Sequence, residues 1–279
     1  MKIDLHMHST ASDGKFSPAE LVDLAISQKM KAIAITDHDS IDGLKEAIDY
    51  SKGKEIEFVS GIEFSANPKG LAKEIHIVGL FIDYSHEAIA NLLRKQEESR
   101  IKSIKKMIEK LNELGYNITY EETKDEAGRE KFGRPVIANV LLKKYNFKDK
   151  KQVFDELLGS NGKAFFMYES SSMKDIISAI HTSGGIAILA HPAYLRENAI
   201  SIIAEFIRLE GDSLEVDCAY SSFGEEAPSL REKFKKIADE KNLIISGGTD
   251  FHDFEISPPI GSFGVTEEEF KKIKDFLKK

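Results

Sequence analysis

Short apolar runs alternate with amphipathic segments along most of this 279-residue chain, and most of the runs end in acidic or histidine residues. The runs have the length and apolar content of buried β-strands, and the segments between them have helical spacing. The predicted strands comprise residues 3–5, 31–36, 56–60, 74–82, 186–190, 213–216 and 243–246. About seven strands alternating with helices favour a closed or nearly closed parallel barrel of the α/β class.

Helix start signals separate the first strands. Ser17, Pro18 and Glu20 have the pattern of an N-cap, a first helical position and a capping-box glutamate, so a helix is predicted to begin there. A second capped helix is predicted over residues 40–51, with Asp39 as its simplest cap.

The alternation breaks in the middle of the chain. A long amphipathic helix is predicted over residues 85–114, and three short helical stretches without a buried strand follow it. We therefore expect a small helical subdomain over residues 100–168, inserted between two parts of the barrel, 1–99 and 169–279. The insert is rich in lysine, which a solvated helix face explains as well as a binding surface does.

The amino-acid composition limits the metal ligands and the binding partners that this chain can have. The single cysteine, Cys218, excludes an internal disulfide and supplies no thiolate cluster, so any metal has to be held by nitrogen and oxygen. The net charge of −8 argues against a protein that coats nucleic acid. The apolar runs are too short to span a membrane, and the N-terminus lacks a secretory pattern, so we expect a cytoplasmic protein without a membrane partner. No pattern indicates an oligomeric state.

A set of histidines and acids lies mostly at the ends of the predicted strands. Its members are His6, His8, Asp13, His38, Glu63, His76, His191, Asp250 and His252. Functional groups of α/β barrels gather at the carboxyl ends of the strands, so we expect these side chains to converge. His86 and His181 fall in predicted helices or their caps and are expected at the surface.

This set offers more ligands than one ion needs, since zinc takes about four and other divalent ions about six. Two or three ions are therefore implied, and closely spaced ions need a bridging carboxylate. Glu63 is the best candidate because it stands alone at its strand end, between the histidine clusters. Such a site generates hydroxide near neutral pH and neutralises charge on a phosphoryl group, so hydrolysis of a phosphoester is expected.

Seven motifs follow one another along the chain: HMHS, SDGKFSP, ITDHD, GIE, EIHIVGL, LAHP and GGTDFH. In this order they resemble the motifs of the PHP (polymerase and histidinol phosphatase) family. Within that family the chain is most similar to the stand-alone phosphoesterases typified by the 3′,5′-nucleoside bisphosphate phosphatases, also described as the 5′-3′ exoribonuclease RNase AM. The resemblance implies a distorted (β/α)₇ barrel that works as a metal-dependent phosphoester hydrolase.

The resemblance also implies a ligand set for each ion and makes Glu63, Asp250 and His191 the expected catalytic residues. The implied sets are His6, His8, Glu63 and Asp250 for the first ion, Asp13, His38 and His252 with bridging Glu63 for the second, and His76 and His191 with Glu63 for the third. Asp13 stands where some relatives carry a histidine, which puts the metal preference of that position in doubt. Manganese is the metal that the subfamily suggests, and zinc and iron stay open.

The segment FGRPVIANVLL, residues 132–142, resembles the stretch that reaches back over the active site in this subfamily. The resemblance implies that Arg134 binds a substrate phosphate through its planar guanidinium. A surface arginine before the helix-starting Pro135 is the structural alternative. Val136 stands where relatives often carry a histidine, so a second phosphate is expected to be held differently. Asp37 is expected to orient a ligand by hydrogen bonding.

The preferred hypothesis is a phosphatase or phosphodiesterase that removes the 3′-phosphate of a nucleoside 3′,5′-bisphosphate or acts on the 5′ end of short RNA. A histidinol-phosphate phosphatase and a cyclic-phosphate phosphodiesterase are alternatives with the same chemistry. A non-catalytic metal-binding PHP module is an alternative of another class, which degenerate ligand positions would favour. A nonspecific RNA-binding role of the basic insert is compatible with either class.

Overall fold

The computed structural model describes residues 3–66, 74–128, 133–166 and 169–278. Contacts within the chain divide it into two units, and each is compact by itself. We call Met1–Leu93 together with Ser171–Lys279 the barrel unit, and Arg94–Ser170 the helical unit. The sequence placed the insert at residues 100–168. Phe132, the first residue of the FGRPVIANVLL segment, lies outside the described residues.

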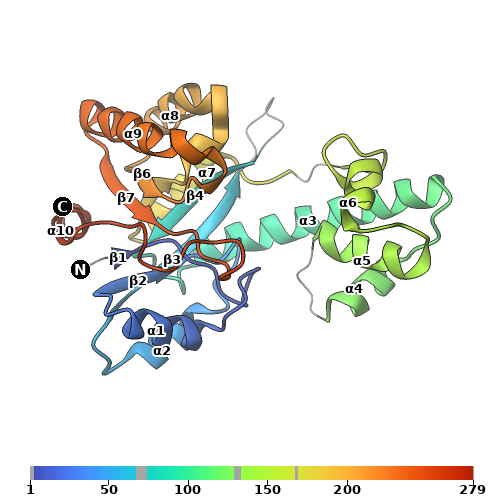
Figure 1. Ribbon diagram of the computed structural model, residues 1–279, viewed down its shortest axis with the longest axis horizontal. Helices are drawn as coiled ribbons and strands as arrows, with labels where there is room; N and C mark the ends of the chain where they lie inside the picture. The colour runs from blue at the N-terminus through green and yellow to red at the C-terminus, as the bar shows by residue number, and fades with distance from the viewer. Residues whose placement is uncertain (1–2, 67–73, 129–132, 167–168, 279) are drawn as a thin grey trace. The chain divides into compact units, whose positions relative to one another are not determined.

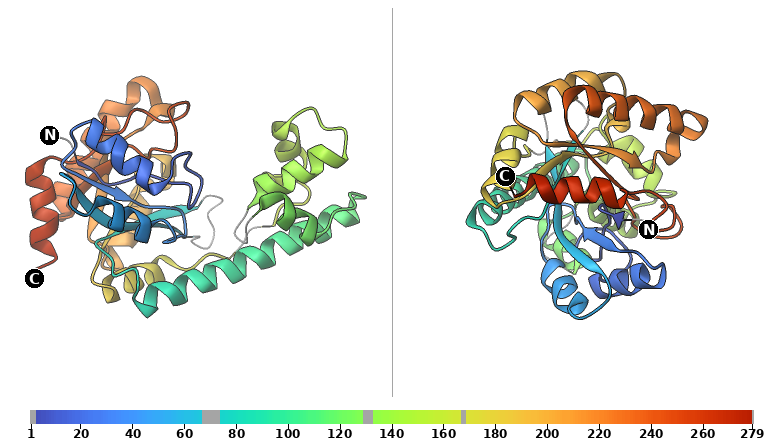
Figure 2. Two further views of the ribbon diagram at one scale, coloured as in Figure 1. Left: turned by 90° about the horizontal axis from the view of Figure 1, so that it is seen from below. Right: turned by 90° about the vertical axis from the view of Figure 1, so that its left-hand side faces the viewer.

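The barrel unit is built on a seven-stranded sheet whose strands neighbour one another in chain order (Figures 1 and 2). The strands are β1 (Ile3–Asp4), β2 (Ala32–Ile35), β3 (Glu57–Ala66), β4 (Ile75–Leu80), β5 (Ile186–Leu189), β6 (Ser213–Cys218) and β7 (Ile244–Gly248). The backbone N–H of Leu5 donates to the carbonyl of Gly247 at 3.2 Å, and Met7 forms a parallel bridge with Phe251. The two ends of the sheet therefore meet, and the expected α/β fold with a nearly closed barrel is confirmed.

Strand β4 departs from the expected parallel arrangement. It is antiparallel to both of its neighbours, β3 and β5, whereas the other neighbouring pairs of the sheet are parallel. The segment 67–74 that joins β3 to β4 is shorter than the dozen or so residues that a crossover between parallel strands needs. Connection length therefore accounts for the reversal, which apolar patterning alone does not reveal.

Alternate residues of β2 pack into two hydrophobic clusters. Ala32 and Ala34 share one cluster with residues of β1, inside the barrel. Ile33 and Ile35 share another with Leu21 of the first helix. A strand whose two faces are both buried reads as a continuous apolar run, and residues 32–35 have this pattern.

Helices cover the outside of the barrel, with α1 and α2 on one side and α8 and α9 on the opposite side (Figure 1). The helices of this unit are α1 (Pro18–Ser27), α2 (Leu44–Ser51), α7 (Met173–Thr182), α8 (Ala199–Arg208), α9 (Ala227–Lys241) and α10 (Glu267–Phe276), with short 3₁₀ segments η2 (Pro192–Asn198) and η3 (Ser221–Glu226). No helix within the described residues is long and apolar enough to cross a membrane.

The two predicted helix starts have different outcomes. Ser17 caps α1 and forms the expected capping box with Glu20. The second prediction was wrong, because α2 begins at Leu44 and Asp39 does not cap it. Asp39 instead has a positive φ of 44° and accepts a hydrogen bond from the backbone N–H of Ser65 at 3.2 Å. Its carboxylate thus joins the loop after β2 to the end of β3.

The helical unit has its own apolar core. Its elements are α3 (Glu87–Glu113), which begins in the barrel unit, followed by α4 (Tyr120–Ala127), α5 (Arg134–Lys144), α6 (Lys150–Val153) and the π-helical turn η1 (Phe154–Leu158). Ile104 and Leu111 of α3 are buried in one cluster with Ile137 and Leu141 of α5 and Leu157 of η1. The apolar spacing predicted for the long helix is therefore used to bury one face.

Candidate metal centre

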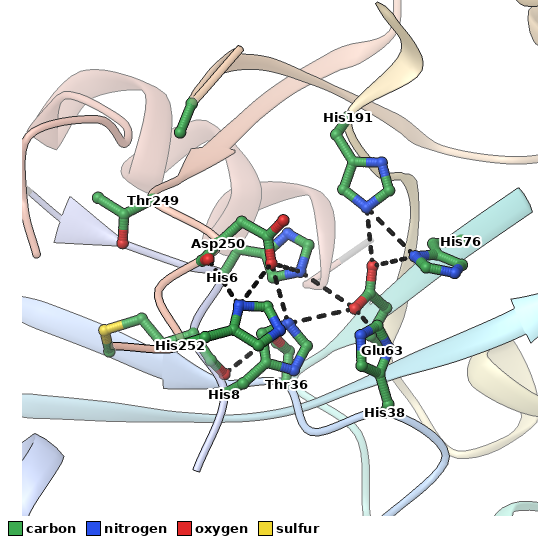
Figure 3. A network of polar contacts seen from close by, with 12 residues as sticks. His6, His8, Thr36, His38, Glu63, His76, His191, Thr249, Asp250 and His252 are labelled. Carbon is green, nitrogen blue, oxygen red and sulfur yellow. Dashed lines mark hydrogen bonds and ion pairs between the residues drawn. The ribbon is translucent and has the colours of Figure 1, made fainter. Parts of the chain in front are cut away.

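Each strand of the barrel unit except β6 contributes a candidate residue to one site. His6 and His8 follow β1, His38 follows β2, and Glu63 lies within β3. His76 lies in β4, His191 follows β5, and Asp250 and His252 follow β7, while Asp13 lies in the turn region after His8. The structure brings all of these side chains together, as Figure 3 shows for most of them.

The buried carboxylate of Glu63 lies at the middle of the site, and each of its oxygens faces a different set of imidazoles. Oε2 lies 2.9 Å from His38 Nδ1, 3.2 Å from His8 Nε2 and 3.3 Å from His6 Nε2. Three ring nitrogens from the ends of two strands thus surround one carboxylate oxygen. A carboxylate that bridges two metal ions would need this position between groups of histidines.

The other oxygen of Glu63 faces a second pair of histidines. Oε1 lies 3.0 Å from both His76 Nδ1 and His191 Nε2, and these two nitrogens lie 3.3 Å apart. A cavity of about 270 Å³ opens beside this pair. It is lined by His38, Glu74, His76, Ala190, His191, Tyr194, Leu195 and Asp250.

Two acids complete the other side of the site. Asp250 Oδ1 lies 3.1 Å from His8 Nε2 and 3.6 Å from His6 Nε2. Asp13 Oδ1 lies 3.4 Å from His252 Nε2 and 3.8 Å from His8 Nδ1. His8 therefore contacts acids through both ring nitrogens, which places it between two groups of ligands.

Within the described residues, the donor atoms form three groups in which all atoms lie within 4.8 Å of one another. The groups are His6, His8, Glu63 and Asp250; His8, Asp13, His38 and His252; and His38, Glu63 and His76. The first group has the same members as the set implied for the first ion. The second contains His8 in place of Glu63, and the third contains His38 in place of His191.

The chemistry of these side chains fits divalent cations. Several of their buried polar atoms have no hydrogen-bond partner among the described residues: His6 Nε2, both ring nitrogens of His8, His38 Nδ1 and Glu63 Oε2. Leaving buried polar atoms unsatisfied costs about 1–3 kcal/mol each, so native proteins rarely do so without a ligand or water. Imidazole and carboxylate donors suit zinc, iron and manganese.

The pKa shifts of these side chains also favour the binding of cations. Burial opposes ionisation of Glu63, but surrounding imidazoles, first that of His38, hold its pKa well below the usual range. Burial also lowers the pKa of His8, but hydrogen bonds to Asp250 and Glu63 overcome it and raise the value to about 9. For His76 the balance of burial against the charge of Glu63 raises the pKa to about 10. The carboxylates thus attract positive charge strongly enough to hold protons on buried imidazoles, and metal cations compete with protons for such sites.

Glu215 supports two of these histidines, and the sequence analysis missed it. Its buried carboxylate lies 2.9 Å from His6 Nδ1 through Oε1 and accepts from the backbone N–H of His191 at 2.6 Å through Oε2. A carboxylate on one ring nitrogen of a histidine fixes the tautomer and directs the other nitrogen, here Nε2, toward the ligand cluster. The signal in the sequence was a glutamate within the predicted strand 213–216.

Asp4 is a second buried acid that was missed. It accepts from the backbone N–H and hydroxyl of Thr249, at 2.9 and 2.6 Å, and from the backbone N–H of Gly261 at 3.0 Å. Burial raises the pKa of this carboxyl to about 6, although the hydrogen bonds oppose the rise. Asp4 therefore ties β1 to the loop that carries Asp250.

Asp37 contacts a turn rather than an imidazole ring. It accepts from the backbone N–H and hydroxyl of Ser9, both at 2.7 Å, and from the hydroxyl of Ser12 at 2.6 Å. These bonds fix the segment between His8 and Asp13. Any effect of Asp37 on the ligands is therefore transmitted through that segment.

Two ligand candidates have backbone conformations that side chains rarely adopt. His191 has a φ of 28° and Asp250 a φ of 51°. Such conformations cost roughly 1–3 kcal/mol each and persist where the surroundings enforce them, which occurs most often at functional sites.

The residues outside the cluster have other partners. Arg134 is the first residue of α5, in the helical unit; its Nη1 donates to the carbonyl of Leu158 at 3.2 Å, and its guanidinium lies 5.3 Å from the ring centroid of Phe165. His181 lies 2.7 Å from Asp212 through Nε2. His86 Nδ1 accepts from the backbone N–H of Ala88 at 3.1 Å, near the start of α3.

Comparison with known proteins decides the family. Residues 4–212 match the model of the PHP domain. The chain belongs to the PHP family. It is 37% identical over 257 residues to a 5′-3′ exoribonuclease of Haemophilus influenzae, with 90% of each chain covered. It is 30% identical over 254 residues to a 3′,5′-nucleoside bisphosphate phosphatase of Chromobacterium violaceum, covering 90% of this chain and 87% of the relative.

A solved structure agrees with this assignment. It belongs to a protein of Bifidobacterium adolescentis assigned to the metal-dependent phosphoesterases, which is 25% identical and superposes with a TM-score of 0.79. The alignment covers 97% of this PHP chain and 94% of that protein. The expected activity class is confirmed: the chain is a metal-dependent phosphoesterase whose histidine, aspartate and glutamate groups can bind metal ions.

Proposed function

We propose that this PHP phosphoesterase acts on a nucleotide that carries phosphate on both sides of its ribose. The two substrates that fit are a nucleoside 3′,5′-bisphosphate, from which the 3′-phosphate is removed, and the 5′ end of a short RNA. Support comes from the relatives at 37% and 30% identity, which are named for these two activities. In both substrates the bond to be broken is on the 3′ side of a nucleotide with a 5′-phosphate.

The observation that carries the proposal is the position of Glu63, whose two oxygens face imidazoles from β1, β2, β4 and β5. We infer two or three divalent ions, with manganese preferred over zinc or iron. The inferred ligands are His6, His8, Asp13, His38, Glu63, His76, His191, Asp250 and His252. Ions at such a site supply an activated water and offset the negative charge of the reacting phosphoryl group.

The protein's own residues then have distinct roles. Glu63 links the groups of ligands, and its negative charge, deep in the barrel, sets where positive charge collects. Asp250 and His191 line the cavity in which the scissile phosphate is placed. Arg134 is proposed to bind a substrate phosphate; a guanidinium has five N–H donors, so its bond to Leu158 leaves donors for that contact. Asp37 is proposed to help place Asp13 through the Ser9–Ser12 contacts.

The test is turnover with a panel of phosphoesters in manganese, zinc and iron(II), after metal analysis of the purified protein. The panel contains adenosine 3′,5′-bisphosphate, a 5′-phosphorylated oligoribonucleotide, histidinol phosphate and a cyclic phosphate. We expect the first two to be hydrolysed with the highest kcat/KM. Preference for histidinol phosphate or the cyclic phosphate would replace the proposed substrate, and no turnover with any metal would favour a non-catalytic module.

Variants test the roles of the acids. Glu63→Gln and Asp250→Asn should abolish turnover while the folded structure, followed by circular dichroism, persists. Glu57→Gln is the matched control, since Glu57 begins the same strand and its exposed side chain pairs with Lys274 at 3.0 Å. Full metal-dependent activity of both active-site variants would contradict the assignment.

A further inference from the structure

A second group of side chains lies next to the metal centre, on the segments that follow β5 and β6. Tyr194 and Arg196 belong to η2, and Phe223 belongs to η3. The ring centroid of Tyr194 lies 5.6 Å from that of the ligand candidate His191 and 5.3 Å from that of Phe223. The Arg196 guanidinium lies 4.2 Å from the centroid of Phe223. The rings of His191, Tyr194 and Phe223 therefore form a continuous row from the metal centre to the guanidinium of Arg196.

Tyr194, the middle ring of this row, is held by a hydrogen bond. Its hydroxyl donates to the carbonyl of Ala219 at 3.2 Å, and its side chain lines the cavity together with His191 and Asp250. A ligand that fills the cavity thus contacts Tyr194, and the Phe223–Arg196 pair lies directly behind that ring, outside the cavity lining.

Arg196 is exposed, and among the described residues no carboxylate forms an ion pair with it. It also interrupts η2 with a φ of 55° and a ψ of −126°, and Gly224 interrupts η3 in the same way with 49° and −123°. At Arg196 this conformation is strained and persists because the surrounding structure enforces it, which occurs most often at functional sites, whereas a glycine adopts a positive φ without that cost. The two interruptions lie in the segments that carry Arg196 and Phe223.

A guanidinium held over an aromatic ring can still donate hydrogen bonds to an anion. The central carbon of the guanidinium lies over the face of the Phe223 ring, which offers no acceptor oxygen, so the N–H groups of Arg196 stay available for a ligand. Two parallel N–H groups match two oxygens of a phosphate. A cation held in this way loses little further side-chain freedom when a phosphate binds.

We propose that Arg196 binds the 5′-phosphate of the nucleotide whose 3′-phosphate lies at the metal centre, with Phe223 holding the guanidinium in place. The inference rests on the proposed function. It identifies the group by which the enzyme distinguishes a bisphosphate, or a 5′-phosphorylated RNA end, from a substrate with a single phosphate. A contact that only joins η2 to η3 would give no such discrimination.

The test compares Arg196→Gln with wild type on adenosine 3′,5′-bisphosphate and on adenosine 3′-monophosphate, both with manganese. Charge-assisted hydrogen bonds lost to a phosphate predict a rise of roughly 10- to 100-fold in the KM for the bisphosphate. The kcat/KM for the monophosphate should not change. The affinity for adenosine 5′-monophosphate, measured by calorimetry, should fall by a similar factor, and Arg196→Lys should restore part of it. Arg208→Gln, an exposed arginine of α8 paired with Glu205, is the control and should change none of these values.

Other results overturn the inference in distinguishable ways. Equal losses on both substrates, or no loss on either, would show that Arg196 does not bind the 5′-phosphate, while wild-type turnover would leave the proposed function standing. Wild-type protein that hydrolyses neither substrate nor a simple aryl phosphodiester would overturn the proposed function together with the inference.

Discussion

Glu215 offers the sharpest test of how the barrel prepares its ligands. Its two oxygens accept from two donors, His6 Nδ1 and the backbone N–H of His191, and its side chain is 3% exposed. Glutamine has the same shape but only one acceptor oxygen, and its amide NH₂ has to face one of these N–H groups. Glu215→Gln therefore leaves one buried donor without an acceptor and removes the charge from the bond to the other.

The expected magnitudes follow from these two bonds. An unsatisfied buried donor costs about 1–3 kcal/mol, and the bond to a charged acceptor contributes about 1.5–3 kcal/mol. We expect the free energy of unfolding of the metal-free protein to fall by about 1–3 kcal/mol. Because His6 then loses the partner that fixes its tautomer, metal affinity should fall roughly 10- to 100-fold.

The measurements are manganese and zinc titrations by calorimetry and urea unfolding of the metal-free protein. Glu205→Gln, which changes an exposed glutamate on α8, is the matched control and should leave both quantities within about 0.5 kcal/mol of wild type. If Glu215→Gln were destabilised but bound metal as tightly as wild type, Glu215 would not position His6. Unchanged stability and unchanged affinity would refute the geometric reasoning entirely.

Three further outcomes are expected. Asp4→Asn should lower the free energy of unfolding by about 1–3 kcal/mol, since an amide cannot accept from all the donors around it, and urea unfolding will show whether it does. The hydrogen bond to Asp212 raises the pKa of His181 above its usual 6.5. The contribution of His181 to stability should therefore be complete below pH 6.5 and disappear as the pH rises through the raised pKa. The difference in melting temperature between wild type and His181→Asn should shrink over the same pH range. Chelation should lower the melting temperature reversibly, because metal present at about 100 times its Kd stabilises the native state by about 2.7 kcal/mol.

The strands and their ends were predictable because buried strands need apolar residues, whereas the site at their ends needs polar ones. Apolar runs marked each strand of the sheet, and polar residues directly after them marked the mouth of the barrel. Ser17 and Glu20 marked the start of α1, since a capping box has a local hydrogen-bond pattern that needs no tertiary context.

Long-range partners were not predictable in this way. Glu215 and Asp4 lie inside strands, where one acidic residue reads as an ordinary polar position until its distant donors are known. Asp39 matched the pattern of a cap, but the chain continues to Gly43 before α2 begins, and the carboxylate bonds to Ser65 instead. The η2 and η3 segments gave no periodic signal, so the contact between Arg196 and Phe223 needed coordinates.

The reversal of β4 explains why His76, unlike the other candidate histidines, lies near the start of its strand. Histidines of the parallel strands follow their strands, whereas His76 is the second residue of β4. Because β4 is antiparallel to β3, its first residues lie beside the last residues of β3, and His76 pairs with Ser65, two positions from Glu63. A parallel β4 would place His76 near the opposite end of the barrel. The antiparallel direction of β4 therefore brings a fifth imidazole to the carboxylate of Glu63, on which the centre depends.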